Sequence, residues 1–159
     1  MICDYAQIMS VLSSIQWEWT NEWWQGFGEL AEVQITERVL SRTTYIVKNC
    51  FEGSLYHLDN LPAFVEINLD VSSVTTENFD AFPFESAEYE LRFEKYKKIS
   101  AEFWGDPDFC GRSEDCTDTY EQEAIQMAVW IHTSARFMLQ LKYEDTEPLI
   151  RICLVFEPL

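Results

Sequence analysis

The chain has 159 residues and a mass of 18.7 kDa, a length that suits one domain with its own hydrophobic core. Apolar residues make up 47% of it, with only five Gly and five Pro, which excludes a disordered or low-complexity polypeptide. The 28 acidic and 11 basic residues give a formal charge of −17, and this charge repels phosphate and anionic lipid. We therefore expect no nucleic acid and no membrane as partner, and instead a basic protein.

The first predicted element is an amphipathic helix over residues 4–24. Its large apolar residues recur at steps of three and four; they are Tyr5, Ile8, Met9, Leu12, Ile15, Trp19 and Trp23. Asp4 is the predicted N-cap, and Gly26 and Gly28 are expected to end the helix and turn the chain. Trp17 and Trp24 lie off the apolar stripe, so we expect them to cover a sheet edge, line a cavity or contact another protein.

Beyond this helix the apolar period changes to two, which predicts β-strands. The predicted strands are residues 33–36, 43–51, 64–71, 88–103, 125–131, 137–143 and 149–156. The run 88–103 is expected to be long or bulged, and the run 125–131 also fits a helical period. Short turns between the last three runs predict an antiparallel meander.

Together these elements predict an α+β fold and a single domain over residues 1–159. The N-terminal helix would pack on a curved antiparallel sheet of about six or seven strands, and the sheet either stays open or closes partly into a barrel. Every apolar stretch is far shorter than the roughly 20 residues of a membrane-spanning helix. The N-terminus lacks the pattern of a secretory signal, so we expect a cytoplasmic protein.

The densest feature is the acidic segment 102–123, which holds eight carboxylates and one basic residue, Arg112. We expect a surface loop whose carboxylates and aromatic side chains contact a basic partner; the alternative is a solvated segment that only maintains solubility. The predicted partner-binding residues are Trp104, Asp106, Asp108, Phe109, Glu114, Asp115 and Asp118, with Glu88, Glu90 and Glu94 on one face of the predicted strand 88–103.

No metal or cofactor is expected. Asp106, Asp108 and Cys110 are spaced as in the opening of a calcium-binding loop, but position twelve is Thr117 rather than a bidentate Glu. Cys110 and Cys116 are close enough in sequence for a small disulfide or for half of a zinc ligand set, but zinc needs about four ligands and the two histidines are not nearby in sequence. We therefore expect a reduced, exposed pair. The chain has no glycine-rich motif of the kind that cradles phosphates.

No catalytic residue is predicted either. His57 and His132 stand alone in the sequence, and no Ser or Cys occupies a recognisable nucleophile motif. Cys3, Cys50 and Cys153 have apolar or strand-like neighbours, which is typical of reduced, buried thiols.

The leading hypothesis is a non-enzymatic acidic protein that inhibits or neutralises a basic partner by covering its surface, as immunity proteins, antitoxins and inhibitors of host defence do. The partner would be a nuclease toxin or a nucleic-acid-binding enzyme, which strong negative charge steers into contact. Two alternatives are a ligand-binding or enzymatic domain with an aromatic pocket on the concave face of the sheet, and a subunit of an obligate assembly.

Overall fold

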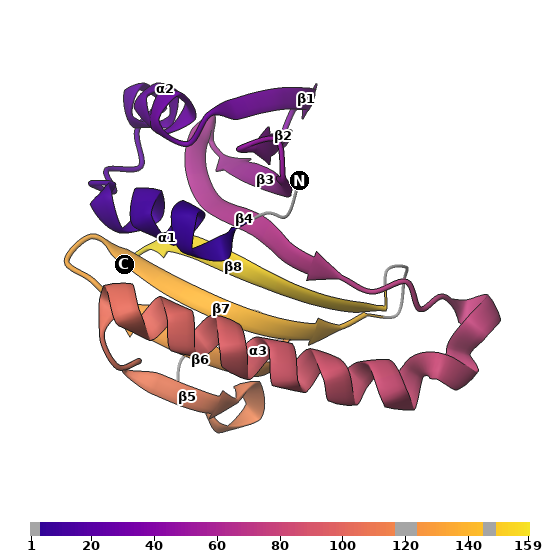
Figure 1. The fold of residues 1–159 in the computed structure, drawn as a ribbon. Coiled ribbons are helices and arrows are strands. Elements are labelled where there is room, and N and C mark those ends of the chain that lie inside the picture. Colours follow the sequence, from indigo (N-terminus) through magenta and orange to yellow (C-terminus); the bar gives the residue numbers. More distant parts are fainter. Residues whose placement is uncertain (1–3, 117–123, 145–148) are drawn as a thin grey trace.

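The computed structural model describes residues 4–116, 124–144 and 149–159. Over these residues the chain forms three α-helices and one antiparallel sheet of eight strands (Figure 1). The α+β class and the antiparallel sheet are confirmed, whereas the predicted strand number of six or seven is too low. The sheet does not close into a barrel, because β1 and β5 are its two edges.

The helices are α1 (Tyr5–Ser14), α2 (Asn21–Leu30) and α3 (Phe82–Trp104). The strands are β1 (Val33–Val39), β2 (Arg42–Val47), β3 (Phe51–Leu58), β4 (Leu61–Val71), β5 (Phe109–Arg112), β6 (Ala124–Ile131), β7 (Ala135–Tyr143) and β8 (Ile150–Pro158). Two 3-10 turns, Thr76–Ala81 and Ser113–Asp115, precede α3 and follow β5. The order across the sheet is β1-β2-β3-β4-β8-β7-β6-β5.

The predicted helix 4–24 is wrong in one respect, because it is two helices. Asp4 is the N-cap of α1, as expected, and its Oδ1 accepts a hydrogen bond of 3.0 Å from the Ala6 amide. A second cap follows at Thr20, whose Oγ1 accepts from the amide of Trp23, so α2 starts anew. Gly26 and Gly28 lie inside α2 and do not end it.

The predicted strand 43–51 is also two strands, the end of β2 and the start of β3. Lys48 and Asn49 between them have φ angles of +54° and +55°, and Asp59 and Asn60 between β3 and β4 have +51° and +65°. Two successive left-handed residues match the twist of a two-residue hairpin. The polar residues at these positions therefore make two tight turns.

The last three strands confirm the predicted meander. β6 pairs with β7 and β7 with β8, both antiparallel. The segment 125–131, for which a helix was the alternative, is the strand β6. β4 contains the predicted strand 64–71 and pairs with β8 in the centre of the sheet.

The predicted strand 88–103 is wrong, because these residues belong to the helix α3. Tyr89, Phe93 and Ser100 are its buried residues, and their spacing of four and seven places them on one helical face. Leu91, which the strand pattern placed beside Tyr89 and Phe93, is 73% exposed. Alternation over a few residues fits either period, and only packing against α1 and the sheet decides between them.

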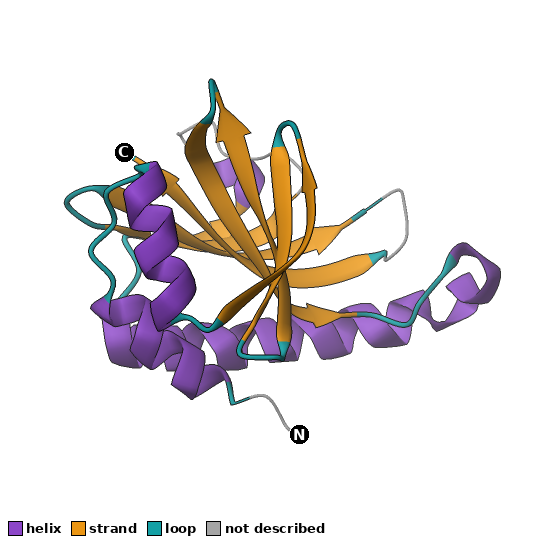
Figure 2. Ribbon diagram, turned by 90° about the horizontal axis from the view of Figure 1, so that it is seen from above, coloured by secondary structure: helices purple, strands orange, loops and turns teal. Residues whose placement is uncertain are grey.

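The core lies on both faces of the sheet. On one face α3 packs against β7 and β8, and α1 packs against α3. The main apolar cluster there includes Ile67 of β4 and Leu154 of β8. A smaller apolar cluster covers the other face and contains Met127, Val129, Met138, Cys153 and Val155. The N-terminal end of α3 projects beyond the sheet, and its C-terminal end lies near the β6–β7 turn (Figures 1 and 2).

The expectation for the cysteines needs correction at one position. Cys50 is disulfide-bonded, whereas Cys153 is a buried free thiol, as expected, and Cys110 and Cys116 are free. Cys3 lies outside the described residues. None of the helices in the described part of the chain is both long and apolar enough to cross a membrane.

Candidate functional site

The candidate site is an aromatic pocket of about 680 Å³ at the C-terminal end of α3. Three segments form it: the end of α1 with the residues that lead to α2, the last residue of α3, and the β6–β7 turn with the start of β7. The lining residues are Leu12, Ser13, Ile15, Gln16, Trp17, Glu18, Trp19, Trp104, His132, Thr133, Ser134 and Phe137.

The break between α1 and α2 turns Trp17 inward. The indole of Trp17 stacks on Phe156 at 4.5 Å between ring centroids and is only 4% exposed. Trp19 has a φ angle of +57°, and its Nε1 donates to the backbone carbonyl of Ser134. The Ser134 hydroxyl in turn donates to the carbonyl of Trp17 at 2.7 Å. These two bonds fix the segment 15–20 against the β6–β7 turn.

Trp104 forms the opposite side of the pocket as the last residue of α3. Its ring lies 4.7 Å from Phe137 and 5.4 Å from Trp130. Gly105 ends the helix with a φ angle of +79°, and its carbonyl accepts a hydrogen bond of 2.8 Å from Nε1 of Trp130. A residue with a side chain is strained at this angle, so Gly105 allows the chain to turn directly after Trp104.

His132 lies at the mouth of the pocket, where its ring stacks on Phe137 at 4.5 Å. No hydrogen bond to its ring is formed by the residues that the structure describes. His57 lines a smaller pocket of about 360 Å³. Its pKa is lowered mainly by burial and further by the positive charge of the nearby Arg38.

Two indole N–H groups beside the pocket have no acceptor. Nε1 of Trp17 and Nε1 of Trp104 are both buried from solvent, and neither donates to an acceptor in the described part of the chain. A buried donor without a partner costs about 1–3 kcal/mol. A bound molecule that brings an acceptor recovers this free energy.

The predicted acidic loop is not a single loop. Trp104 belongs to α3, Phe109 to β5 and Asp115 to a 3-10 turn, while Asp118 lies outside the described residues. Phe109 is half-buried and packs against the apolar cluster on the far face of the sheet, so it lies apart from Trp104, and its role as a partner contact stays a prediction.

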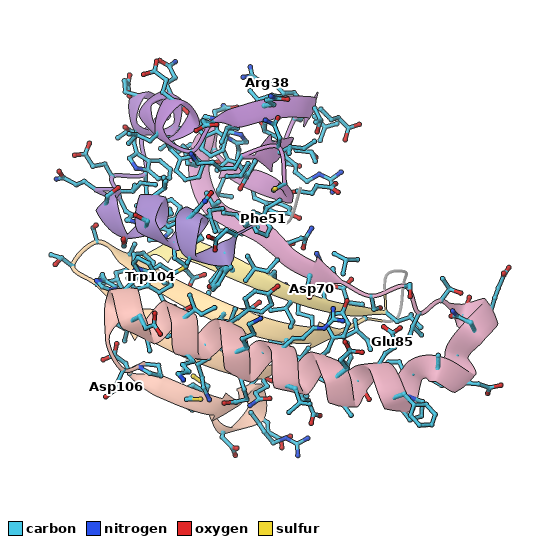
Figure 3. All side chains as sticks on the ribbon, in the orientation of Figure 1. Arg38, Phe51, Asp70, Glu85, Trp104 and Asp106 are labelled. Atoms are coloured by element: carbon cyan, nitrogen blue, oxygen red, sulfur yellow. The ribbon has the colours of Figure 1, made fainter. Side chains whose placement is uncertain are left out.

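Trp104 and Asp106 lie at the same end of α3 (Figure 3), and Asp108 follows two residues later. Asp106 and Asp108 are exposed in the turn between α3 and β5. Oδ2 of Asp108 accepts a hydrogen bond of 2.7 Å from the amide of Ile131, the residue before His132. This acidic turn therefore lies next to the strand end that supports the pocket.

The other predicted carboxylates lie apart. Glu88, Glu90 and Glu94 are on α3 and share no strand face, which corrects that prediction. Glu88 pairs with Arg92 one helical turn away, and Glu94 pairs with Lys97 at 2.6 Å. Glu114 pairs with Arg112 at 3.2 Å, and Asp115 is exposed.

A buried ionic cluster on β4, β7 and β8 was missed by sequence reasoning. Glu66 contacts Lys142 at 3.0 Å and Arg151 at 2.9 Å, and Lys142 is fully buried. Arg151 also donates to Asn68 and pairs with Glu144. Burial opposes ionisation of Glu66, but the two cations outweigh it and lower the pKa of this carboxyl. The alternation of polar and apolar residues in β4 was the available signal for Glu66. The residues that pair with Glu66 are distant in sequence, so the sequence alone did not indicate them.

In the described part of the chain, no three His, Cys, Asp or Glu side chains are grouped so that they could hold a metal ion. Comparison with protein-family models, curated proteins and solved structures gave no match.

Proposed function

We propose that this protein is a non-enzymatic binding protein that neutralises a basic protein partner by covering its active or nucleic-acid-binding surface. The observation that carries the proposal is a group of four carboxylates, called here the acidic rim. Glu18 lines the aromatic pocket, and Glu102, Asp106 and Asp108 lie in the last turn of α3 and just after it, close in sequence to Trp104. All four residues are exposed, and none forms an ion pair with another described residue.

The distribution of the cations supports this proposal. Eight of the eleven Lys and Arg side chains pair with carboxylates of residues that the structure describes. The remaining acidic surface therefore lacks internal neutralisation, which favours rapid encounter with a cationic surface.

The aromatic pocket supplies desolvated anchor residues, which charge alone does not provide. Binding free energy concentrates in desolvated aromatic and Arg anchors at the centre of an interface, with charged residues around them. Trp19, Trp104 and His132 line the pocket together with Glu18 of the acidic rim, and we expect them to form such a centre. The proposed interface is thus the C-terminal end of α3 with the segments that border the pocket.

A cytoplasmic location belongs to the same proposal. The disulfide of Cys50 is the observation against this location, because glutathione keeps most cytosolic thiols reduced.

A second candidate function is small-molecule binding in the aromatic pocket. The indole donors of Trp17 and Trp104, which have no acceptor in the described part of the chain, favour it.

Affinity capture from the native source, with elution over a salt gradient, tests the proposal. We expect a basic protein to be retained at low salt and released as the salt concentration rises, because screening weakens attraction between exposed charges. The double variant Glu102→Gln/Asp106→Asn should retain several-fold less of it.

The matched control is Glu77→Gln/Asp80→Asn, which removes the same charges from the 3-10 turn at the other end of α3. It should retain the partner as the unmodified protein does. The proposal would be contradicted if the amount of partner retained changed neither with salt concentration nor in either double variant.

A further inference from the structure

We infer that the aromatic pocket binds an arginine side chain, together with the peptide carbonyl of the same segment, from the partner protein. This inference rests on the proposed function and specifies how the partner is held. It is carried by three properties of the pocket: the sign of its charge, its flat aromatic walls and its unpartnered donors.

The charge of the pocket selects a cation. No Lys or Arg is among its lining residues, and the carboxylate of Glu18 is among them. The turn with Asp106 and Asp108 adds negative charge nearby, since Asp108 bonds to the backbone beside His132. An anionic ligand would meet repulsion on both sides, whereas a cation gains attraction from each.

The walls favour a planar cation over a compact one. Trp17 and Trp19 have ring centroids 5.7 Å apart, and Phe137 lies 5.4 Å from Trp17 and 4.7 Å from Trp104, so aromatic rings continue from one side of the pocket to the other. Guanidinium groups stack on aromatic faces and hold less water than an ammonium group. An arginine side chain therefore fits these walls better than a lysine.

The donors of Trp17 and Trp104 require an acceptor that guanidinium lacks. Both indole N–H groups are buried without a partner in the described part of the chain. A peptide segment brings backbone carbonyls next to its arginine, so one bound residue supplies both the cation and the acceptor. A free amine supplies the cation but no acceptor, and a purely apolar ligand supplies neither.

Nuclear magnetic resonance of the indole N–H signals tests the inference on the unmodified protein. The probes are N-acetyl-arginine methylamide, the corresponding citrulline compound, which is its neutral isostere, and the lysine compound. We expect the arginine compound to shift the signals of Trp17 and Trp104, each assigned by its Trp→Phe variant. The citrulline compound should bind at least several-fold more weakly, and the lysine compound should fall between them.

Two variants locate the charge. Glu18→Gln removes the carboxylate that lines the pocket and should weaken arginine binding several-fold. Glu52→Gln removes an exposed carboxylate of β3 away from the pocket and should leave it unchanged. Because both side chains are exposed, neither change should affect folding.

Three results would overturn the inference: equal binding of citrulline and arginine, which would indicate a neutral planar ligand; tighter binding of lysine; or no shift of either indole at tens of millimolar arginine compound. If arginine fails while Glu102→Gln/Asp106→Asn still weakens capture of a basic partner, the proposed function stands and the pocket has another role.

Discussion

At Gly53 the absence of a side chain is a packing requirement. A Cβ atom there would lie 2.6 Å from the ring of Tyr45 and 2.6 Å from the carbonyl oxygen of Glu66. Tyr45 is fully buried, and its hydroxyl donates to that same carbonyl at 3.1 Å. The ring is therefore held between β3 and β4 and cannot move aside.

We predict that Gly53→Ala lowers the free energy of unfolding by about 1–3 kcal/mol through overpacking. Gly26→Ala is the control, since Gly26 is exposed in α2 with nothing within 4 Å of an added Cβ; it should raise stability by roughly 0.5–1 kcal/mol. Urea unfolding of both variants measures the difference, and a neutral Gly53→Ala would contradict the close approach.

Glu66 has a different role, because it is the shared anion of two cations inside the sheet. Glu66→Gln leaves Lys142 and Arg151 in place with one fewer anion. We predict a loss of about 3–5 kcal/mol of stability, the usual cost of breaking a buried pair. Glu52→Gln, at an exposed position of the neighbouring strand β3, should change stability by less than about 0.5 kcal/mol.

The pKa of Glu66 also predicts an acid dependence. Lys142 and Arg151 outweigh the effect of burial and lower this pKa in the folded state, so the charged form favours folding. The contribution is fully present above the unfolded-state pKa of about 4.3 and is lost as the pH falls through the lower folded-state value. Stability measured against pH should decline less steeply in this acid range for Glu66→Gln than for the unmodified protein.

At the scale of the element, α3 has a carboxylate near each end, and the one at its C-terminal end lowers the stability of the helix. Glu85 lies in the first turn, where the helix dipole favours a carboxylate, but the last turn contains Glu102 and no basic residue. A carboxylate at a helix C-terminus is unfavourable, so packing and helix stability do not account for Glu102. The proposed binding of a cationic partner would account for it.

We predict opposite effects at the two ends of α3. Glu102→Gln should raise the free energy of unfolding by about 0.3–1 kcal/mol, and Glu85→Gln should lower it by a similar amount. Thermal unfolding at low salt checks both signs, and added salt should reduce both effects. A stability loss in Glu102→Gln would show that this carboxylate has a structural partner.

At the scale of the whole molecule, the disulfide of Cys50 replaces the expectation of a wholly reduced protein. Cross-links stabilise mainly by restricting the unfolded chain. We predict that reductant lowers the free energy of unfolding by about 2–4 kcal/mol, and that Cys50→Ala does the same without reductant.

Cys110→Ala is the control for this prediction, because Cys110 is an exposed free thiol. It should unfold as the unmodified protein does, with or without reductant. An unfolding midpoint that does not respond to reductant would mean that Cys50 is reduced in solution, which would remove the objection to a cytoplasmic location.

The sequence by itself determined the features that depend on neighbours along the chain. The Asp4 cap, the strand β4 and the β6–β7–β8 meander follow from local hydrogen bonding and from a period that holds over a whole strand. The net charge of −17 also needs no coordinates. Each of these properties is a sum or a pattern over consecutive residues.

Only the tertiary structure decided the features that depend on distant residues. A helix and a strand give similar patterns over the few residues around Tyr89, and packing against α1 and the sheet selects the helix. The pocket brings Trp17, Trp104 and His132 together from three separate segments. The partners of Glu66 are 76 and 85 residues away. No local pattern encodes such contacts, because they form only when the sheet places its strands side by side.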